Sequence, residues 1–129
     1  MKGKILLIED NEQNRYLTTF LLEKHGHEVV PAFDGPKGIE LAERIAPDVI
    51  LLDIQLPSMD GYTVAQELRK LAALKDIPII AVTSYAMAGD REKAISAGCN
   101  GYIEKPINPE TFVAEVERFI VNTGKEPRS

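Results

Sequence analysis

Acidic, hydroxyl and lysine side chains recur in this chain where short apolar segments end. Residues 5–8, 49–52 and 77–82 are apolar runs typical of parallel strands buried on both faces, and residues 101–104 form a further candidate strand. The polar side chains that end or follow these segments are Glu9, Asp10, Asp53, Thr83, Ser84, Glu104 and Lys105. Because ligands of an open parallel sheet bind outside the carboxyl ends of its strands, we expect these side chains to meet at one edge.

The charges at that edge indicate which chemistry it supports. The carboxylates of Glu9, Asp10 and Asp53 would repel one another unless one has a raised pKa or a hard cation lies between them. Mg²⁺ or Mn²⁺ fits oxygen ligands, which Asp10, Asp53 and the backbone carbonyl of Gln55 could supply, with positions left for a phosphoryl oxygen. The three carboxylates (−3), Lys105 (+1) and the ion (+2) sum to zero formal charge, so the pocket is predicted to accept an anion.

The segments between the apolar runs have the spacing of amphipathic helices. A further strand at residues 28–32 completes five β/α units, which predicts a doubly wound α/β domain. The expected helices are one that ends before Gly26, one from Asp34-Gly35-Pro36 to before Pro47, residues 62–74, residues 90–97, and a last one that starts at Asn108-Pro109 and buries Phe112, Val113, Val116, Phe119 and Ile120.

Length, composition and charge exclude several classes of function. The 129 residues suit one domain, and 44% hydrophobic with 27% charged residues is ordinary for a chain that folds unaided. The net charge of −5, without any Lys/Arg cluster longer than a pair, argues against direct binding of nucleic acid. No apolar run approaches the roughly 20 residues that span a bilayer, and no signal-peptide cleavage site follows the N-terminus. We therefore expect a cytoplasmic protein without a membrane segment.

The cysteine and histidine content makes a zinc site improbable. The chain has one cysteine, Cys99, and two histidines, His25 and His27, which we interpret as structural or surface residues without catalytic partners. A metal ion would then be bound by oxygen ligands alone.

Several motifs together identify a family. They are Glu9-Asp10-Asn11, Leu52-Asp53-Ile54-Gln55-Leu56-Pro57, Asp60-Gly61, Ala81-Val82-Thr83-Ser84 and Lys105-Pro106. With them the chain resembles a response-regulator receiver domain of two-component signalling. The segments at residues 83–90 and 97–102 are similar in particular to stand-alone receivers and to receivers of hybrid histidine kinases. The resemblance implies a flavodoxin-like, five-stranded parallel sheet of order 2-1-3-4-5 with five helices, a receiver domain at residues 1–122 and a short polar tail at residues 123–129.

The resemblance also implies a role for each residue of the polar edge. Asp53 would accept a phosphoryl group from a histidine kinase or a histidine phosphotransfer protein, and Lys105 would pair with the phosphoryl oxygens. Asp10 would hold the metal directly, whereas Glu9, which stands where many members have a second aspartate, would act through water. The family has a cis peptide bond at the position of Lys105-Pro106.

The expected output is a changed protein surface. In the family, the hydroxyl at Thr83 bonds the phosphoryl group while the aromatic ring at Tyr102 turns inward, which repacks the fourth helix, fifth strand and fifth helix. A downstream partner protein would read that surface, with the chain as a monomer or a phosphorylation-dependent dimer. Apart from slow self-phosphorylation and self-dephosphorylation no enzymatic turnover is expected, and Gln55 and Tyr85 flank the acceptor, where we expect them to tune the attack of water.

Other interpretations remain open for the same residues. Asp53 could cap a turn, Glu9 and Asp10 could favour a helix N-terminus, Thr83 could be a strand residue, and Tyr102 could only pack. A phosphatase or phosphotransferase of the haloacid-dehalogenase type is a second function, although the position two after Asp53 is Gln55 instead of a carboxylate. Flavin binding is disfavoured by the acidic loop after the first strand. A constitutive, receiver-like binding module is the third alternative.

Overall fold

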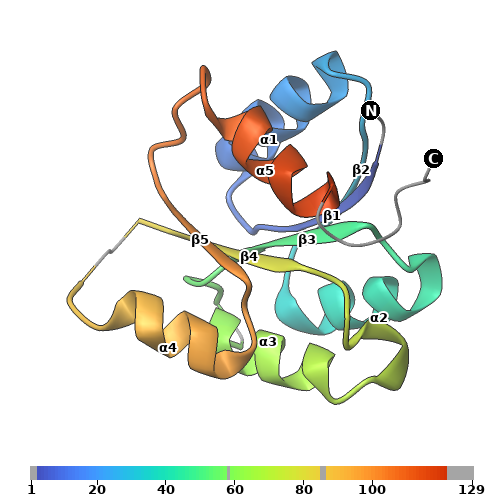
Figure 1. The fold of residues 1–129 in the computed structure, drawn as a ribbon, viewed down its shortest axis with the longest axis vertical. Helices are drawn as coiled ribbons and strands as arrows, with labels where there is room; N and C mark the ends of the chain where they lie inside the picture. Colours follow the sequence, from blue (N-terminus) through green and yellow to red (C-terminus); the bar gives the residue numbers. More distant parts are fainter. Residues whose placement is uncertain (1–2, 58, 85–86, 122–129) are drawn as a thin grey trace.

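A computed structural model describes residues 3–57, 59–84 and 87–121 as one parallel sheet with helices on both faces (Figure 1). The five strands lie in the order β2-β1-β3-β4-β5, and every neighbouring pair is parallel. They are β1 (Lys4–Ile8), β2 (Glu28–Ala32), β3 (Val49–Asp53), β4 (Ile79–Thr83) and β5 (Gly101–Glu104). This confirms the doubly wound, flavodoxin-like fold with strand order 2-1-3-4-5.

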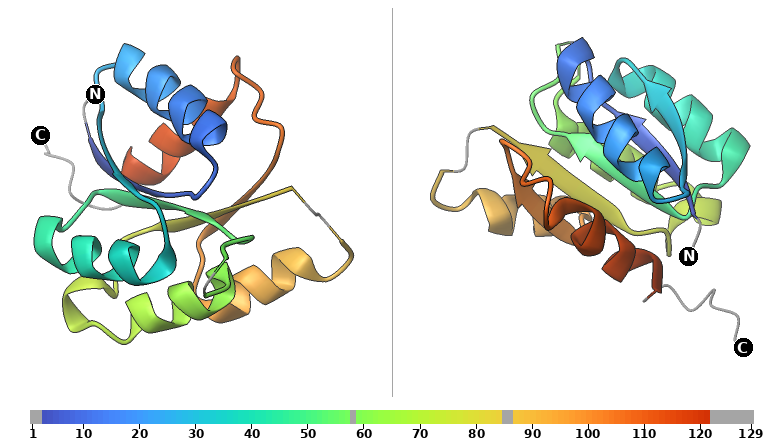
Figure 2. Two further views of the ribbon diagram at one scale, coloured as in Figure 1. Left: turned by 180° about the vertical axis from the view of Figure 1, so that it is seen from behind. Right: turned by 90° about the horizontal axis from the view of Figure 1, so that it is seen from above.

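The helices form one layer on each side of the sheet. They are α1 (Glu12–Lys24), α2 (Gly35–Ile45), α3 (Gly61–Arg69), α4 (Asp90–Ala97) and α5 (Phe112–Val121), with a short 3₁₀ helix η1 (Ala72–Leu74) after α3. Figures 1 and 2 show α1 and α5 on one face and α2, α3 and α4 on the other. The longest of these helices has 13 residues, and in the described part of the chain none is long and apolar enough to cross a membrane.

The strands are apolar throughout because the sheet is covered on both faces. In β1, Leu6 and Ile8 belong to the core under α2, α3 and α4, whereas Ile5 and Leu7 belong to the core under α1 and α5. This alternation is the period-2 geometry of a strand. Two separate hydrophobic cores therefore fix the sheet from both sides and hold the ends of its strands in register.

Two predicted boundaries around the fourth strand were wrong. The third helix, predicted to reach Leu74, ends at Arg69, and Leu71 adopts an extended conformation before the 3₁₀ turn. The guanidinium of Arg69 donates to the backbone carbonyls of Leu74 and Gly98, and this non-local contact supports the turn instead of a further helical turn. The fourth strand begins at Ile79 rather than at Ile77, since the N–H of Ile77 bonds the Leu74 carbonyl in that turn.

The predicted start of the last helix was also wrong. Asn108-Pro109 opens a turn, and the helix begins at Phe112. The side chain of Asn108 accepts from the Glu110 N–H at 2.9 Å, and its carbonyl accepts from the Phe112 N–H at 2.9 Å. Asn108 thus caps a turn with its side chain, as predicted, but this turn precedes the helix. The predicted domain end at residue 122 and the tail at residues 123–129 lie outside the described residues.

Candidate functional site

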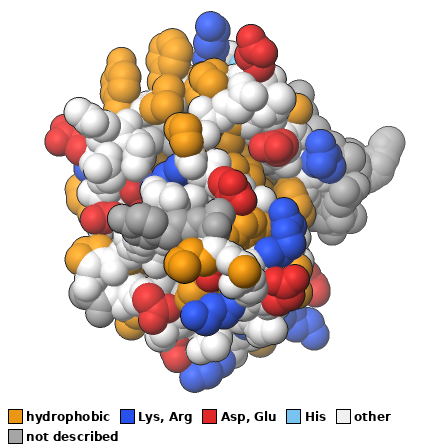
Figure 3. All heavy atoms as spheres, turned by 90° about the vertical axis from the view of Figure 1, so that its left-hand side faces the viewer, with side chains coloured by type: hydrophobic (Ala, Val, Ile, Leu, Met, Phe, Trp, Pro, Cys, Tyr) orange, Lys and Arg blue, Asp and Glu red, His pale blue; other side chains and the backbone are white. Residues whose placement is uncertain are grey.

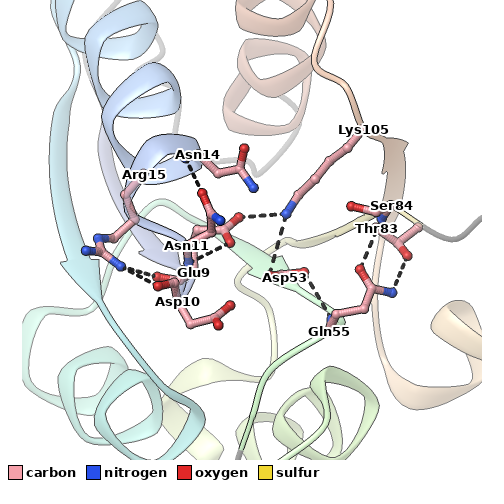
Figure 4. A network of polar contacts seen from close by, with 10 residues as sticks. All are labelled: Glu9, Asp10, Asn11, Asn14, Arg15, Asp53, Gln55, Thr83, Ser84 and Lys105. Atoms are coloured by element: carbon pink, nitrogen blue, oxygen red, sulfur yellow. Dashed lines mark hydrogen bonds and ion pairs between the residues drawn. The ribbon is translucent and has the colours of Figure 1, made fainter.

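Six of the seven polar residues predicted to meet at one edge lie together at the carboxyl ends of four strands (Figure 4). They are Glu9, Asp10, Asp53, Thr83, Ser84 and Lys105, whereas Glu104 is exposed at the end of β5. The parallel register places Ile8 opposite Leu52, Asp53 opposite Val82, and Thr83 opposite Glu104. Strands β1, β3, β4 and β5 consequently end at the same level, and the residues that end or follow them share one edge. The backbone N–H of Lys105 donates to the Thr83 carbonyl at 2.8 Å and extends this register past β5.

Lys105 lies between two buried carboxylates. Its Nζ is 2.9 Å from Glu9 Oε1 and 3.5 Å from Asp53 Oδ2. The side chains of all three residues are at most 10% exposed, so the two contacts are little screened by water. The peptide bond between Lys105 and Pro106 is cis, as the resemblance implied. One cation therefore faces two anions in a buried cluster, which leaves one negative charge uncompensated.

This imbalance changes the acidity of Asp53. Burial, followed by the hydrogen bond and the charge of Glu9, raises the pKa of Asp53 from 3.8 to about 7, although Lys105 and the Gln55 N–H act in the opposite direction. The Gln55 N–H donates to Asp53 Oδ1 at 3.0 Å. A carboxyl with a pKa near neutrality readily exchanges its proton for another cation, and such shifts are common at functional sites.

The residues fit a hard divalent cation. One carboxylate oxygen from each of Glu9, Asp10 and Asp53 lies within 4.8 Å of the other two, and oxygen is the donor that Mg²⁺ prefers. Glu9 already contacts Lys105 through Oε1 and the Asn11 N–H through Oε2 at 3.2 Å. Asp10 is exposed, and among the described residues no hydrogen bond or ion pair engages its carboxylate. This difference suits direct contact between Asp10 and the ion and a water-mediated role for Glu9. Both roles remain predictions, and so does a contact between the ion and the Gln55 carbonyl.

Arg15 on α1 is a site residue that the sequence reasoning missed. Its Nη1 donates to the carbonyls of Glu9 and Asp10 at 3.0 Å each, and its guanidinium lies 3.9 Å from the centre of the Phe33 ring. These contacts hold the acidic loop between β1 and α1. A signal was available, because an arginine near the N-terminal end of a helix opposes the helix dipole and needs another reason to be there.

The side chain of Gln55 makes two contacts that the sequence did not predict. Its Nε2 donates to Thr83 Oγ1 at 2.6 Å, and its Oε1 accepts from the Ser84 N–H at 3.0 Å. Gln55 thus bridges the loop after β3 and the end of β4, as Figure 4 shows. Tyr85, the other residue expected to flank the acceptor, lies outside the described residues.

Tyr102 lies on β5, which pairs with β4 on the side away from β3. Its side chain packs toward α4, away from the acidic cluster. It is half-buried against the core under α2, α3 and α4, and the Arg91 guanidinium lies 5.2 Å from the centre of its ring. Its hydroxyl is buried without a hydrogen-bond partner among the described residues. The geometry agrees with a packing role as well as with a switch residue, so the switch remains a prediction.

The cysteine and histidines lie outside the acidic cluster. Burial raises the pKa of Cys99 to about 11, which keeps the thiol protonated and unreactive. His25 contacts the Leu21 carbonyl at the end of its own helix, at 3.0 Å. His27, for which no partner was expected, accepts the Gly3 N–H on Nδ1 and contacts Glu117 of α5 through Nε2 at 2.7 Å. It links the residue before β2 to α5 and is structural.

Gly61 fixes the backbone next to Asp53. Its N–H donates to the Ile54 carbonyl at 2.9 Å, and a Cβ at this position would lie 2.5 Å from Ile54 Cα and 2.7 Å from the Asp53 carbonyl oxygen. Both are backbone atoms that cannot rotate away. The first turn of α3 therefore packs directly on the end of β3.

Gly61→Ala is expected to lower the free energy of unfolding by about 1 to 3 kcal/mol, because the added methyl group overpacks a backbone contact. Urea denaturation measures this loss, and NMR should show shifted amide signals at Ile54 and Gln55. Gly89→Ala is the comparison, since a Cβ there meets nothing within 4 Å and only the left-handed backbone (φ 89°) is strained. Equal losses in both variants, without shifts near Asp53, would show that the contact with β3 does not matter.

The face seen from the side at which β4 ends carries charges of both signs. Figure 3 shows Lys and Arg side chains interspersed with Asp and Glu, and hydrophobic side chains in its upper part. The exposed aromatic residues include Tyr16 and Phe20, whose rings stack on α1 with centroids 6.4 Å apart. No continuous basic surface is visible in this view, as the composition indicated.

Known proteins are similar to this chain in both sequence and fold. Residues 5–117 match the model of the response regulator receiver domain. The polar-differentiation response regulator DivK of Brucella anthropi is 38% identical over 120 residues, which are 93% of this chain and 98% of that protein. Among solved structures, the CheY-like receiver domain protein of Methanospirillum hungatei has a TM-score of 0.89 at 28% identity and covers 98% of this chain and 100% of its own.

One similar structure contains a metal ion. The receiver domain of a sensor histidine kinase from Pseudomonas aeruginosa, described with a magnesium ion coordinated in its active-site cleft, has a TM-score of 0.81 at 37% identity, covering 94% of this chain and 96% of its own. The family model spans most of the chain, and the relatives named here match over nearly their full length. The observed strand order is the one that the resemblance implied. The chain therefore belongs to the response regulator receiver domain family of two-component signalling proteins.

Proposed function

We propose that Asp53 accepts a phosphoryl group from the phosphohistidine of a histidine kinase or a histidine phosphotransfer protein. The observation that carries this proposal is the position of Asp53: a carboxylate 3% exposed, at the end of a central strand, between Lys105 and two further carboxylates. A structural aspartate at a strand end has no need of this surrounding, because a single backbone donor would satisfy it.

The transfer requires that Asp53 be ionised when it attacks. One carboxylate oxygen attacks the phosphorus atom, the phosphorus–nitrogen bond of the donor breaks, and the imidazole nitrogen leaves with the bonding electron pair. A Mg²⁺ ion bound by Asp10, Asp53 and the Gln55 carbonyl would supply positive charge that favours the ionised carboxylate and neutralises the phosphoryl oxygens. Lys105, which contacts both Glu9 and Asp53 in the unmodified protein, would pair with the same oxygens.

The transferred group changes the charge of the site and thereby the adjoining surface. An acyl phosphate carries about −2 where the carboxylate carried −1. Thr83 at the end of β4 would bond the new oxygens, and Tyr102 on the next strand would respond, which alters the surface of α4, β5 and α5. A partner protein would read that surface, in the cytoplasm, with residues 1–122 as the receiver and the chain as a monomer or a phosphorylation-dependent dimer.

The phosphatase alternative is less well supported. It requires a second carboxylate two residues after the nucleophile, and Gln55 stands there with its amide engaged by Thr83 and Ser84. A neutral amide cannot exchange a proton as a general acid. A constitutive binding module with the same fold is the remaining alternative, and the following experiment distinguishes it.

Intact-protein mass after incubation with acetyl phosphate tests the proposed function. We expect a single phosphoryl adduct that requires Mg²⁺ and is absent from Asp53→Asn. Asp76→Asn is the matched control, because Asp76 is exposed and lies outside the site, and it should react like the wild type. Beryllofluoride, a non-covalent mimic, should shift the NMR signals of α4 and β5 in the presence of Mg²⁺. No adduct and no shift under any condition would instead support the constitutive binding module.

A further inference from the structure

The amide of Gln55 has a defined orientation. The Ser84 backbone N–H can only donate, so the atom that it contacts at 3.0 Å must be the carbonyl oxygen Oε1. The amide nitrogen Nε2 then faces Thr83 Oγ1, and the 2.6 Å contact is a hydrogen bond donated to the hydroxyl oxygen. Reversing the amide would place two donors against each other at Ser84.

Both contacts involve groups that an anion on Asp53 would need. The Thr83 hydroxyl and the Ser84 N–H are donors at the end of β4, and β4 pairs with β3 so that Asp53 lies opposite Val82, one residue before Thr83. The backbone N–H of Gln55 itself donates to Asp53 Oδ1. Gln55 therefore contacts the acceptor through its main chain and the end of β4 through its side chain.

We propose that the Gln55 side chain restrains the end of β4 and competes with the phosphoryl group for it. The inference rests on the proposed function, since it concerns the regulation of the same site. In the unmodified protein the amide occupies the Ser84 N–H and holds the Thr83 hydroxyl in place. When Asp53 is phosphorylated, the charged oxygens take the Ser84 N–H from Gln55 Oε1, and a neutral hydrogen bond exchanges for a charge-assisted one. The Thr83 hydroxyl accepts from Gln55 Nε2, so it keeps its own proton to donate, but it must leave the position in which the amide holds it. Gln55 is a positioning residue that favours the inactive arrangement.

The side-chain length of Gln55 is part of this argument. The amide reaches from the loop after β3 to the last residue of β4 and the residue that follows it, and both of its polar ends are used. An asparagine is one methylene shorter and cannot reach both groups from the same backbone position. Gln55→Asn keeps the amide and the backbone carbonyl. Any effect of this variant therefore reports the length of the side chain and not the loss of the amide group.

The first test measures the restraint without any phosphoryl chemistry. The Ser84 amide belongs to an exposed residue whose N–H is protected by Gln55 Oε1. Its exchange with water, followed by NMR, should accelerate several-fold in Gln55→Ala and in Gln55→Asn. Gln66→Ala is the matched control, because Gln66 is exposed on α3, and it should leave the Ser84 exchange rate unchanged. Unchanged exchange in all variants would overturn the restraint.

The second test measures the competition. Beryllofluoride titrated in saturating Mg²⁺ should bind Gln55→Ala roughly fivefold more tightly than the wild type, the effect of one neutral hydrogen bond that no longer has to be broken. The wild type and Gln66→Ala should bind alike. Equal or weaker binding to Gln55→Ala would overturn the inference, and weaker binding would show that the amide itself contacts the anion.

Failure of the proposed function has a different signature. If the wild type binds beryllofluoride in a way that Asp53→Asn abolishes, the acceptor site exists, and only the comparison with Gln55→Ala decides the inference. If the wild type neither binds beryllofluoride nor gains a phosphoryl adduct, the proposed function is wrong, and the competition is overturned with it.

Discussion

Replacing Asp53 with asparagine should stabilise the metal-free protein by about 2 to 4 kcal/mol at pH 8, and by much less at pH 5. The reason is the buried, uncompensated negative charge next to Glu9. Burial and Glu9 raise the pKa of Asp53 from 3.8 to about 7, so at pH 8 the folded protein holds an ionised carboxylate in an unfavourable place. Asparagine has nearly the same shape and carries no charge at either pH.

The pH dependence has a definite sign. Between about pH 4 and pH 7 the folded state binds a proton at Asp53 that the unfolded state has lost, so the stability of the wild type falls as the pH rises through this window. Below pH 4 Asp53 is protonated in both states, so the buried carboxyl no longer lowers the stability of the folded protein. The gain from Asp53→Asn therefore grows from pH 5 to pH 8 and levels off above the pKa of the folded state.

Urea denaturation in chelator at pH 5 and pH 8 measures this effect, with Asp76→Asn as the control for a carboxylate lost from the exposed surface. Added Mg²⁺ should stabilise the wild type and have little effect on Asp53→Asn, because a ligand that binds only the folded state stabilises it. A variant that is less stable than the wild type at pH 8 in chelator would contradict the charge imbalance.

The sequence allowed the fold and the polar edge to be predicted because both depend on local, repeated patterns. Continuous apolar runs predicted buried parallel strands, and the residues at their ends had to meet once the sheet was parallel. Asp10, Asp53 and Lys105 were found in this way. The residue pattern of a single segment does not show in which direction a side chain turns when its hydrogen-bond partner lies on another segment.

The contacts that were missed are of this second kind. Gln55 reaches Thr83 and Ser84 across 28 and 29 residues of sequence, and Arg69 ends the third helix by bonding Gly98 across 29 residues. Each depends on one rotamer in a packed environment. Arg15 contacts the carbonyls of the loop before its helix and the Phe33 ring, and only its unfavourable place near a helix N-terminus could have revealed it.

Lys105→Met should lower the free energy of unfolding in chelator by about 3 to 5 kcal/mol at pH 8. Methionine keeps much of the length and apolar volume of the lysine, so the loss reports the charge. Without Lys105, the carboxylates of Glu9 and Asp53 are buried with no cation facing them among the described residues. The loss should be smaller at pH 5, where Asp53 takes up a proton, and Mg²⁺ should restore part of the stability at pH 8.

A surface ion pair of nearly the same length provides the control for Lys105. Lys70 Nζ lies 3.0 Å from Glu67 Oε2, but the Lys70 side chain is 69% exposed, and Lys70→Met should cost no more than about 0.5 kcal/mol. Adding Glu9→Gln to Lys105→Met should recover stability, because it removes one of the two anions that the lysine compensates. If both lysine variants lose the same stability, or if Glu9→Gln adds a further loss, Lys105 does not balance the charges of this cluster. The distance between lysine and glutamate is almost equal in the two pairs, so the difference in cost would come from burial and from the second anion, Asp53, that Lys105 faces.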